Sequence, residues 1–481
     1  MNFGDRHTGD LSGRLRTIAE TRQLDVAINV APMHAALASV QHTAWMLINL
    51  LARMQHIVGS VRVNAPSVRQ AGRVVPFATR RSTLQDALVE GGTSIGVVPV
   101  IGGSNADLTF NIGPEQPGMS VYGNAWTGGI STTPIAAARE SSLPIGPYLA
   151  ACLAASEAFR HARFKAYTPT TGSFYTAWQH RTRTTPTWDG PTALPTLEID
   201  AVLAGVGAVG STVLHVLWTL ESTGIVRAAD FDLIDGTNLN RCPIFDARGI
   251  GQAKTLYATQ VLQESTVTIL PHDGSWERFV PDVLDQTIVL SAVDKNAVRA
   301  GIQDQYFPRL LQASTADLRA EVFRAIPGSG PCLRCYSPPE PRLTDETLRA
   351  TLAADPTRIA ATSAATGIDE REILSWAQNG ACGTTSAALL PLLQRTAVEP
   401  RQFSVGFVSV AAGTLLAAEL LKTTLGAATP LNAGFPRAVL QFFSPESTGN
   451  GAVRYARDPQ CPKCDPHSIA AQYWRQRARA S

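Results

Sequence analysis

Apolar and polar positions along the chain alternate between short apolar runs and longer amphipathic stretches, a pattern typical of α/β proteins. The early part predicts strands at residues 25–32 and 106–113 and helices at residues 35–54 and 145–162. A similar order returns further along, where residues 408–423 predict another late apolar helix. We therefore expect a doubly wound, Rossmann-like α/β fold whose element order occurs twice in the chain.

The clearest single motif lies in residues 201–210, AVLAGVGAVG, an apolar run that ends in G-x-G-x-x-G at Gly205, Gly207 and Gly210. Such glycines let backbone N–H groups at the start of a helix approach a phosphate closely. Residues 201–220 are also uncharged and as long as a membrane span, but glycines between a strand and a helix favour a globular element. Taken alone, the motif fits NAD or FAD as well as ATP.

A polar set after the glycines narrows the choice of nucleotide. Asp230 ends the next predicted strand, where a nucleotide-binding fold places a carboxylate near the ribose. Asn238, Arg241 and Lys254 follow, and a triphosphate needs such groups whereas nicotinamide does not. Asp294 ends a further apolar strand, and a carboxylate at that edge suits Mg²⁺ carried by phosphates. Each residue alone also fits a surface charge or a helix cap, so the prediction of an ATP site depends on their combination.

These segments resemble the adenylating domain of the ubiquitin-activating (E1) superfamily, which includes the ThiF, MoeB and HesA proteins. The matching segments are GVGAVG, DFDLIDGTNLNR and SAVDKNAVR. The resemblance implies that Asp230 binds the ATP ribose and that Asp294 coordinates Mg²⁺. It also implies that Asn238, Arg241 and Lys254 hold the phosphates, with Arg241, Lys254 and Asp294 acting in catalysis.

Two cysteine pairs predict a metal site. Cys332-x-x-Cys335 and Cys461-x-x-Cys464 supply four thiolates, enough to complete a tetrahedral shell around a structural Zn²⁺. A redox pair or two disulfides would use the same residues, but the polar N-terminus predicts no secretory signal. The E1-like family carries a zinc ion in these two places.

Composition agrees with a soluble, cytoplasmic enzyme. The chain has 481 residues and a net charge of only +2, which indicates neither nucleic acid nor a membrane as a partner. Residues 168–196 are rich in Thr and Pro and predict a linker between folded units. The expected organisation is an inactive adenylation-like domain at 1–167, the linker at 168–196, an active adenylation domain with the zinc site at 197–340 and 400–481, and an inserted catalytic-cysteine segment at 341–399.

The first domain lacks the glycine motif, because its corresponding turn is residues 29–34, NVAPMH. We expect no ATP there, and the resemblance implies an inactive and an active repeat fused as a pseudo-dimer. An unrelated α/β accessory domain remains the alternative. The family also supplies an arginine to the ATP site from an N-terminal segment, for which Arg14 and Arg16 are candidates; both also fit solvated helix charges.

The inserted segment carries the predicted nucleophile, Cys382, flanked by Gly380-Ala381 and Gly383. A helix beginning near Thr384 would lower the pKa of this thiol through its dipole. E1 enzymes carry their catalytic cysteine in this interval, although a small buried residue at a helix junction also fits. Cys152 and Cys242 are more typical of core positions.

The resemblance therefore implies ATP-dependent adenylation of the C-terminus of a ubiquitin-like protein, thioester formation on Cys382 and transfer to an E2-like protein. The chain is similar to the E1 components of bacterial ubiquitin-like conjugation operons linked to phage defence. The alternative is a ThiF- or MoeB-like adenylyltransferase that passes its adenylate to sulfur for cofactor or thionucleoside synthesis. A nicotinamide oxidoreductase and a non-catalytic scaffold fit the residues less well.

Overall fold

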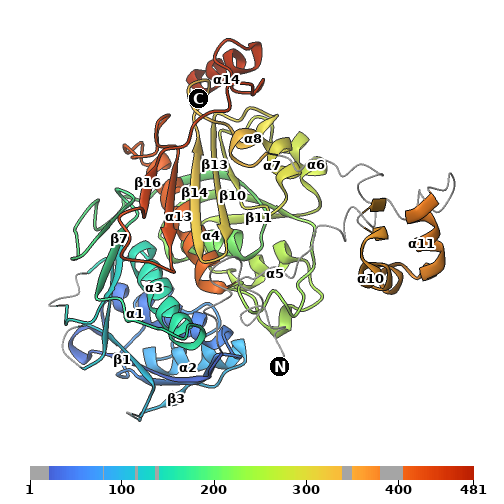
Figure 1. Cartoon of the computed structure of the whole chain (residues 1–481). Helices are drawn as coiled ribbons and strands as arrows, with labels where there is room; N and C mark the ends of the chain where they lie inside the picture. Colours follow the sequence, from blue (N-terminus) through green and yellow to red (C-terminus); the bar gives the residue numbers. More distant parts are fainter. Residues whose placement is uncertain are drawn as a thin grey trace. The chain divides into compact units, whose positions relative to one another are not determined.

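The computed structural model describes most of the chain, namely residues 21–79, 81–103, 105–113, 117–135, 140–338, 349–350, 352–379 and 405–480. The chain divides into two compact units, a main unit of residues 1–338 and 403–481 and a small unit of residues 339–402. The main unit holds the candidate nucleotide site, and Figure 1 shows its helices around a large sheet.

Sixteen strands of the described residues form one mixed sheet, which has two halves. The N-terminal half contains β1 (Leu24–Val30), α1 (Ala38–Arg53), β2 (Val58–Asn64), α2 (Leu84–Ile95), β3 (Val100–Ile101), β4 (Leu108–Ile112), β5 (Met119–Asn124), β6 (Thr127–Ser131), α3 (Ile145–Arg163), β7 (Gly172–Thr176) and β8 (Arg181–Arg183). The strands predicted at 25–32 and 106–113 and the helices predicted at 35–54 and 145–162 are confirmed as β1, β4, α1 and α3.

The C-terminal half begins where β8 ends. It contains β9 (Glu198–Ala204), α4 (Ala208–Thr219), β10 (Thr223–Asp230), α5 (Lys254–Val261), β11 (Thr268–Asp273), α6 (Trp276–Phe279), β12 (Ile288–Ser291), α7 (Asn296–Gln303), β13 (Arg309–Ala316), β14 (Arg319–Ala325), α8 (Leu333–Tyr336), α13 (Gly406–Thr424), β15 (Arg437–Gln441), β16 (Gly451–Val453) and α14 (Ile469–Ala480). The helix predicted at 408–423 is confirmed as α13.

The two halves of the sheet have the same topology. The strand order runs β11-β10-β9-β12-β13-β14-β15-β16 in one half and continues β8-β7-β6-β5-β4-β1-β2-β3 in the other. Counted from the outer edge strand of each half, β11 or β3, the first four pairings are parallel and the next three are antiparallel. β16 and β8 pair antiparallel at Gly451 and Arg181, which joins the halves into one sheet.

Residues 168–196, for which the Thr- and Pro-rich composition predicts a linker, contain regular structure. They include β7, which pairs with β6, and β8, which pairs with β7. The alternation of Ser173, Phe174 and Tyr175 is hidden in the sequence because all three side chains are buried. Composition detects only the flanking turns.

Buried helices hold the two halves together. α1 contacts α3, α3 contacts α13, and α13 contacts α4, so the four helices form a chain of contacts across both halves. A single hydrophobic cluster accordingly includes Trp45 of α1, Phe159 of α3, Leu416 of α13 and Leu217 of α4. Among the described helices, α13 alone is long and apolar enough to suit a membrane span, and its apolar window is completely buried inside the main unit.

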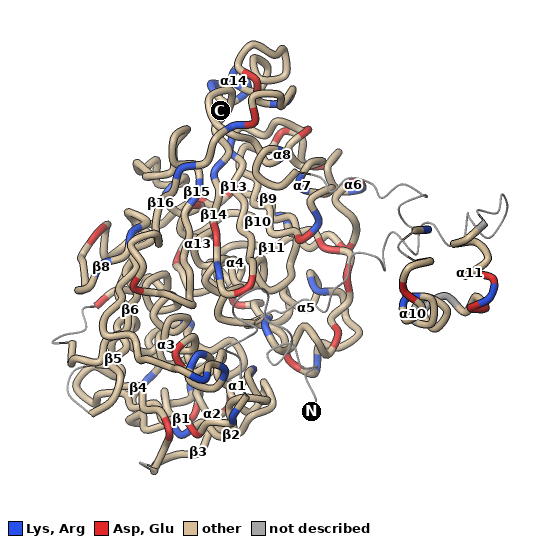
Figure 2. The backbone as a smooth tube through the Cα atoms, viewed as in Figure 1, with Lys and Arg blue, Asp and Glu red and all other residues tan. Residues whose placement is uncertain are grey.

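The small unit contains α10 (Pro356–Thr366) and α11 (Glu370–Asn379). Asp355 caps the start of α10 by accepting a hydrogen bond from the Thr357 N–H, and Gly367 ends it in the left-handed conformation. Ile373 and Trp376 of α11 form a separate small core with Leu352 and Ile359. Figure 2 shows acidic and basic residues along this helix pair.

Candidate nucleotide site

The glycine motif lies at the junction of β9 and α4. Gly205 has φ +93°, and a Cβ there would approach the carbonyl oxygen of Ala292 to 2.9 Å. A Cβ on Gly210 would collide with the carbonyl of Gly205, whereas one on Gly207 would meet open space. The motif therefore allows close packing against the loop after β12 and leaves the middle glycine accessible to a ligand.

The start of α4 can accept an anion. Gly207 is the N-cap residue, and no side chain caps this end of the helix. The first turn of a helix has N–H groups without intrahelical acceptors, and the helix dipole adds positive potential there. This end of α4 is thus a suitable place for phosphate oxygens.

Asp230 lies at the carboxyl end of β10 and holds the glycine loop in place. One carboxylate oxygen accepts the Val206 N–H at 2.7 Å and the other accepts the Asp232 N–H at 2.9 Å. Burial raises the pKa of Asp230, and the ammonium group of Lys254 opposes this shift. Each carboxylate oxygen has a second lone pair, so Asp230 retains capacity to bind a ribose hydroxyl.

Lys254 begins α5 and is brought to the same edge of the sheet. Its Nζ lies 2.6 Å from a carboxylate oxygen of Asp232 and 4.0 Å from one of Asp230. Burial lowers the pKa of Lys254, but the two carboxylates more than offset this and hold the pKa above its usual value. A phosphate would compete with the half-exposed Asp232 for this ammonium group.

The loop from Asp235 to Asp246 carries the other predicted phosphate ligands. Asn238 is buried, and its Oδ1 accepts the Asp235 N–H at 3.1 Å. Arg241 is partly exposed, and its Nη1 donates to the carbonyl oxygen of Thr237 at 2.7 Å. Asn238 therefore also shapes the turn that presents Arg241.

Asp294 follows β12, whose four residues are all buried and three of which pair parallel with β9. The predicted apolar strand is thus confirmed, and Asp294 is exposed at its carboxyl end. Neighbouring Lys295 places its Nζ 5.9 Å from the ring centre of Phe231, which follows Asp230. The ends of β10 and β12 therefore face each other across the glycine loop, which leads into α4.

One residue of this site was not assigned from the sequence. Asp232 forms the shortest ion pair of Lys254, so it controls where the ammonium group rests. The Asp-x-Asp spacing was the available signal, because residues two apart along a strand point to the same face of the sheet.

The four paired cysteines come together at the other end of the C-terminal half. Their sulfur atoms all lie within 4.8 Å of one another. The Sγ atoms of Cys332 and Cys461 are 3.7 Å apart, and those of Cys335 and Cys464 are 3.4 Å apart. A tetrahedral Zn²⁺ with bonds of 2.3 Å needs sulfur–sulfur distances of about 3.8 Å, so this donor set could hold zinc.

The remaining cysteines differ in what the structure describes. Cys382, like Arg14 and Arg16, lies outside the described residues. Cys242 is buried, and burial raises the pKa of its thiol despite nearby cationic groups. Cys152 is buried in α3, and burial raises its pKa well above the usual value. Neither is suited to form a thiolate.

Comparison with known proteins agrees with this geometry. The sequence profile of the ThiF family matches residues 192–463, which is more than half of the chain. The chain belongs to the ThiF family. This ThiF-family chain has the Rossmann-like α/β fold of the E1-like superfamily, with Asp230, Lys254 and the glycine loop at the carboxyl edge of its sheet.

A second profile, the BilD N-terminal domain, matches residues 25–174. This match begins in β1 and ends in β7, so it covers most of the N-terminal half of the sheet. The two profiles therefore divide this ThiF-family chain close to the junction between the two halves.

Two relatives were found among curated sequences. A Sinorhizobium fredii protein named uncharacterized protein y4jF is 25% identical over 363 residues, covering 71% of this chain and 64% of its own length. A Saccharomyces cerevisiae protein named ubiquitin-activating enzyme E1-like is 28% identical over 149 residues, covering 29% of this chain and 23% of its own length. This ThiF-family chain thus spans less than two thirds of either relative.

Solved structures give weaker matches. E. coli MccB with MccA-N7isoASN aligns with TM-score 0.38 and 17% identity over 56% of this chain and 67% of that one. E. coli MccB with ATP aligns with TM-score 0.37 and 16% identity over the same shares, 56% and 67%. These scores carry no structural argument, and the family assignment rests on the sequence profile.

Proposed function

We propose that this protein is an E1-like activating enzyme that adenylates the C-terminus of a ubiquitin-like protein with ATP. The acyl group then passes to Cys382 as a thioester and onward to an E2-like protein. The observation that carries this proposal is that Asp230 holds the glycine loop before the uncapped start of α4 and lies 4.0 Å from Lys254, in a ThiF-family chain.

The first chemical step needs positioning more than proton transfer. The terminal carboxylate of the protein substrate is already ionised near neutral pH, so it can attack the α-phosphate without a general base. A bond forms between the carboxylate oxygen and the α-phosphorus, and the bond to the leaving pyrophosphate breaks. Arg241 and Lys254 would neutralise the charge that develops on the phosphates.

Asp294 is the residue suited to hold Mg²⁺. Magnesium is commonly bound by one or two protein carboxylates together with substrate phosphates and water. An exposed carboxylate beside the glycine loop meets this requirement. The ion would add charge neutralisation to that of the two cationic side chains.

The second step requires a thiolate. The thiolate attacks the carbonyl carbon of the acyl-adenylate, AMP leaves, and a thioester forms. We propose Cys382 for this role because the other cysteines are either paired in the four-thiol cluster or buried with raised pKa values. An E2-like thiol would then exchange with this thioester.

We further propose that the N-terminal half is an inactive repeat of the adenylation fold, so that one chain forms a pseudo-dimer. Two observations support this: its strand order mirrors that of the ThiF-matched half, and it lacks glycines in the turn after β1. We propose Zn²⁺ as the ion of the four-thiol cluster, where it would tie the C-terminal segment to the segment after β14.

ATP–pyrophosphate exchange with candidate ubiquitin-like proteins tests the first step. Exchange that depends on the terminal glycine carboxylate of one candidate would support the proposal. Exchange with none of them, in the presence of Mg²⁺ and of protein shown to be folded, would contradict it.

A non-reducing gel tests the second step. Cys382→Ala should keep pyrophosphate exchange and lose the reductant-sensitive adduct with the ubiquitin-like protein. Cys242→Ala is the matched control and should keep both, because its thiol is buried. An adduct that survives in Cys382→Ala would show that the nucleophile is misassigned. Turnover that needs a sulfur donor and no enzyme thioester would favour the sulfur-transfer alternative.

A further inference from the structure

A buried arginine of the N-terminal half reaches into the loop that carries Arg241. Arg53, at the end of α1, is 1% exposed. Its Nη1 donates to the carbonyl oxygen of Leu239 at 2.5 Å, and its Nη2 donates to those of Pro243 at 3.1 Å and Phe245 at 3.0 Å. One guanidinium group therefore satisfies three carbonyls of a single loop.

Asn49, one helical turn earlier in α1, completes the arrangement. Its Oδ1 accepts the Nε–H of Arg53 at 2.8 Å, and its Nδ2 donates to the carbonyl oxygen of Pro243 at 2.9 Å. Asn49 is fully buried, so both amide groups depend on these bonds. The pair forms a rigid clamp because each member orients the other.

Burial of this charge is costly and is not relieved by an ion pair. Within the described residues, no carboxylate lies within ion-pair distance of Arg53. Burial lowers the pKa of Arg53 to about 10, and more distant Asp246 opposes the shift. A buried charge that is balanced mainly by carbonyl dipoles is tolerated only when hydrogen bonds satisfy it well. The geometry of the loop thus depends strongly on this side chain.

The clamped carbonyls lie on either side of Arg241. Residues 238–246 begin with buried Asn238 and contain Arg241, and Gly406 at the start of α13 packs against the Arg241 backbone. A Cβ on Gly406 would lie 3.4 Å from both the Arg241 Cα and Leu50 of α1. The loop is therefore enclosed between a helix from each half, and a shift of the clamp would move Arg241.

We infer that Asn49 and Arg53 are positioning residues by which the N-terminal half sets the phosphate-facing loop of residues 238–246 for nucleotide binding. In this role, Asn49 and Arg53 do not touch the nucleotide, and both act by fixing the loop that carries Arg241. The inference rests on the proposed function for the role of Arg241, and it explains what the N-terminal half contributes to a site that lies in the other half.

The chain contains a matched control in Arg73. This second buried arginine of the N-terminal half donates to the carbonyls of Trp218 and Leu220 and pairs with Glu221 at 3.2 Å. It therefore clamps the C-terminal end of α4. That helix has 12 residues, so the clamp lies about 18 Å from the end that faces the phosphates.

Arg53→Met and Arg73→Met should separate positioning from general stability. In Arg53→Met we expect at least tenfold faster amide hydrogen exchange in residues 238–246 and at least a tenfold rise in both the KM and the Kd for ATP. Arg73→Met should lose thermal stability while both constants stay within twofold of wild type. Arg53→Lys should recover part of the affinity, because an ammonium group can donate to some of the same carbonyls.

Equal changes of KM in Arg53→Met and Arg73→Met would overturn the inference, and so would unchanged amide exchange in residues 238–246. If Arg53→Met does not fold, Asn49→Ala provides the test: unchanged amide hydrogen exchange in residues 238–246 and an unchanged KM for ATP in that variant would also overturn the inference. If the wild-type protein shows no ATP–pyrophosphate exchange with any candidate substrate, the proposed function fails. Amide exchange of ligand-free protein still shows whether the clamp orders the loop.

Discussion

The carboxyl ends of β1 and β9 occupy equivalent positions in the two halves of the sheet but differ in chemistry. After β9, the glycine loop leads directly into α4, which begins at Ala208. After β1, Pro32 starts a short 3₁₀ turn, and α1 does not begin until Ala38. A proline offers no N–H, so the turn after β1 presents fewer donors to an anion.

The starts of the two helices differ in the same sense. The Ala38 N–H at the start of α1 donates to a carboxylate oxygen of Glu140 at 3.3 Å. An acidic side chain therefore already occupies the start of α1, whereas no side chain caps the start of α4. Asn64 ends β2, the counterpart of β10, which ends in Asp230. Asn64 donates to Asn29 at 2.7 Å, and Asn29 donates to Asn111 at 2.8 Å.

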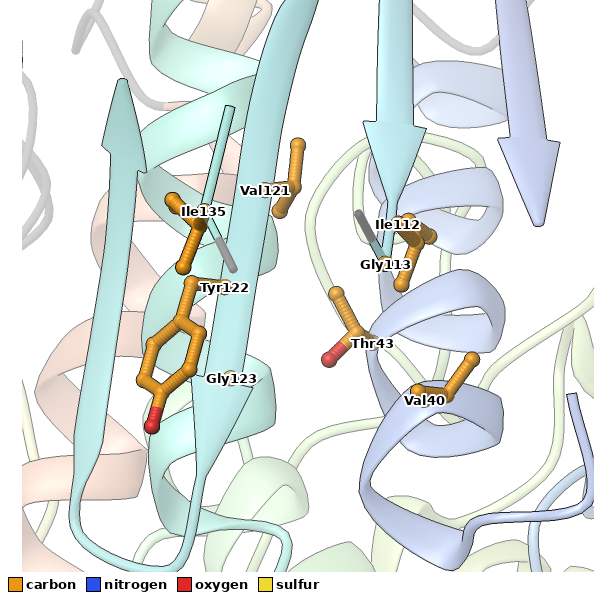
Figure 3. Close-up of a pocket in the computed structure, with 8 residues that line it drawn as sticks. All are labelled: Val40, Thr43, Ile112, Gly113, Val121, Tyr122, Gly123 and Ile135. Atoms are coloured by element: carbon orange, nitrogen blue, oxygen red, sulfur yellow. The ribbon is translucent and has the colours of Figure 1, made fainter. Parts of the chain in front are cut away.

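The N-terminal half still has a hollow at this edge, with a volume of about 480 Å³, lined in part by Asn29, Pro32 and Asn64. A second hollow between α1 and the neighbouring strands holds only about 10 Å³, no more than one water (Figure 3). The same topology thus carries N–H donors and a charged strand end in one half and a proline turn with uncharged amides in the other, and only the first combination suits a phosphate.

Metal removal should have the largest effect and should distinguish the halves. The four-thiol cluster lies in the C-terminal half, and structural zinc contributes on the order of 10 kcal/mol in small modules. We expect about one equivalent of zinc per chain and a fall in Tm of roughly 10 °C in Cys464→Ser. Amide exchange should quicken around β14 and α14 and stay unchanged in β1–β6. Freely titrating thiols and no bound zinc would contradict the assignment.

Asp230→Ala should abolish most nucleotide chemistry, whereas Asn64→Ala should not. Asp230 holds the glycine loop and balances Lys254, so we expect pyrophosphate exchange to fall by about 10³-fold, which corresponds to about 4 kcal/mol. Asp294→Ala should lose exchange to a similar extent with the fold intact. Asn64→Ala should change exchange less than twofold. Comparable losses in both halves would mean that the N-terminal half binds the nucleotide too.

Two buried histidines on equivalent helices predict a pH dependence of stability. Burial lowers the pKa of His42 on α1 to about 4 and that of His215 on α4 to about 3. In the unfolded chain these histidines titrate near pH 6.5. Their contribution to the free energy of unfolding is therefore fully present above that pH and is lost as the pH falls toward 4. For His42, the expected loss of unfolding free energy between pH 7 and pH 5 is about 2 kcal/mol.

His42→Leu should therefore flatten the stability profile between pH 7 and pH 5, measured by urea unfolding at each pH. His215→Leu should flatten it as well, but at the loss of the Tyr148 hydrogen bond. An unchanged slope in both variants would show that the histidines are not buried in their neutral form.

The smallest expected effect concerns the two turns. Gly205→Ala places a Cβ at φ +93° and 2.9 Å from the Ala292 oxygen, so we expect a loss of roughly 1–3 kcal/mol in stability and about tenfold slower pyrophosphate exchange. Ala31→Gly, at the equivalent turn, has ordinary φ −62° and should change neither by much. An Ala31→Gly effect on exchange as large as that of Gly205→Ala would contradict the division of roles.

Local pattern was sufficient for much of the molecule. Long apolar runs predicted α1, α3 and α13, which are buried on nearly all sides, and short apolar runs predicted the strands β1 and β4. The glycine spacing predicted the β9–α4 turn, since positive φ and close backbone contact exclude other residues there. Asp230, Lys254 and Asp294 could be proposed as site residues from the sequence because each stands at the end or start of a predicted element.

Tertiary structure alone decided how separate segments combine. The strands within residues 168–196 are only five and three residues long, so their stability comes from pairing with their neighbours in the sheet. The Asp232 ion pair and the clamp of Asn49 and Arg53 join residues that are far apart in sequence. An arginine at the end of an apolar helix resembles a solvated charge in sequence, and only packing against the 238–246 loop gives it buried carbonyl partners.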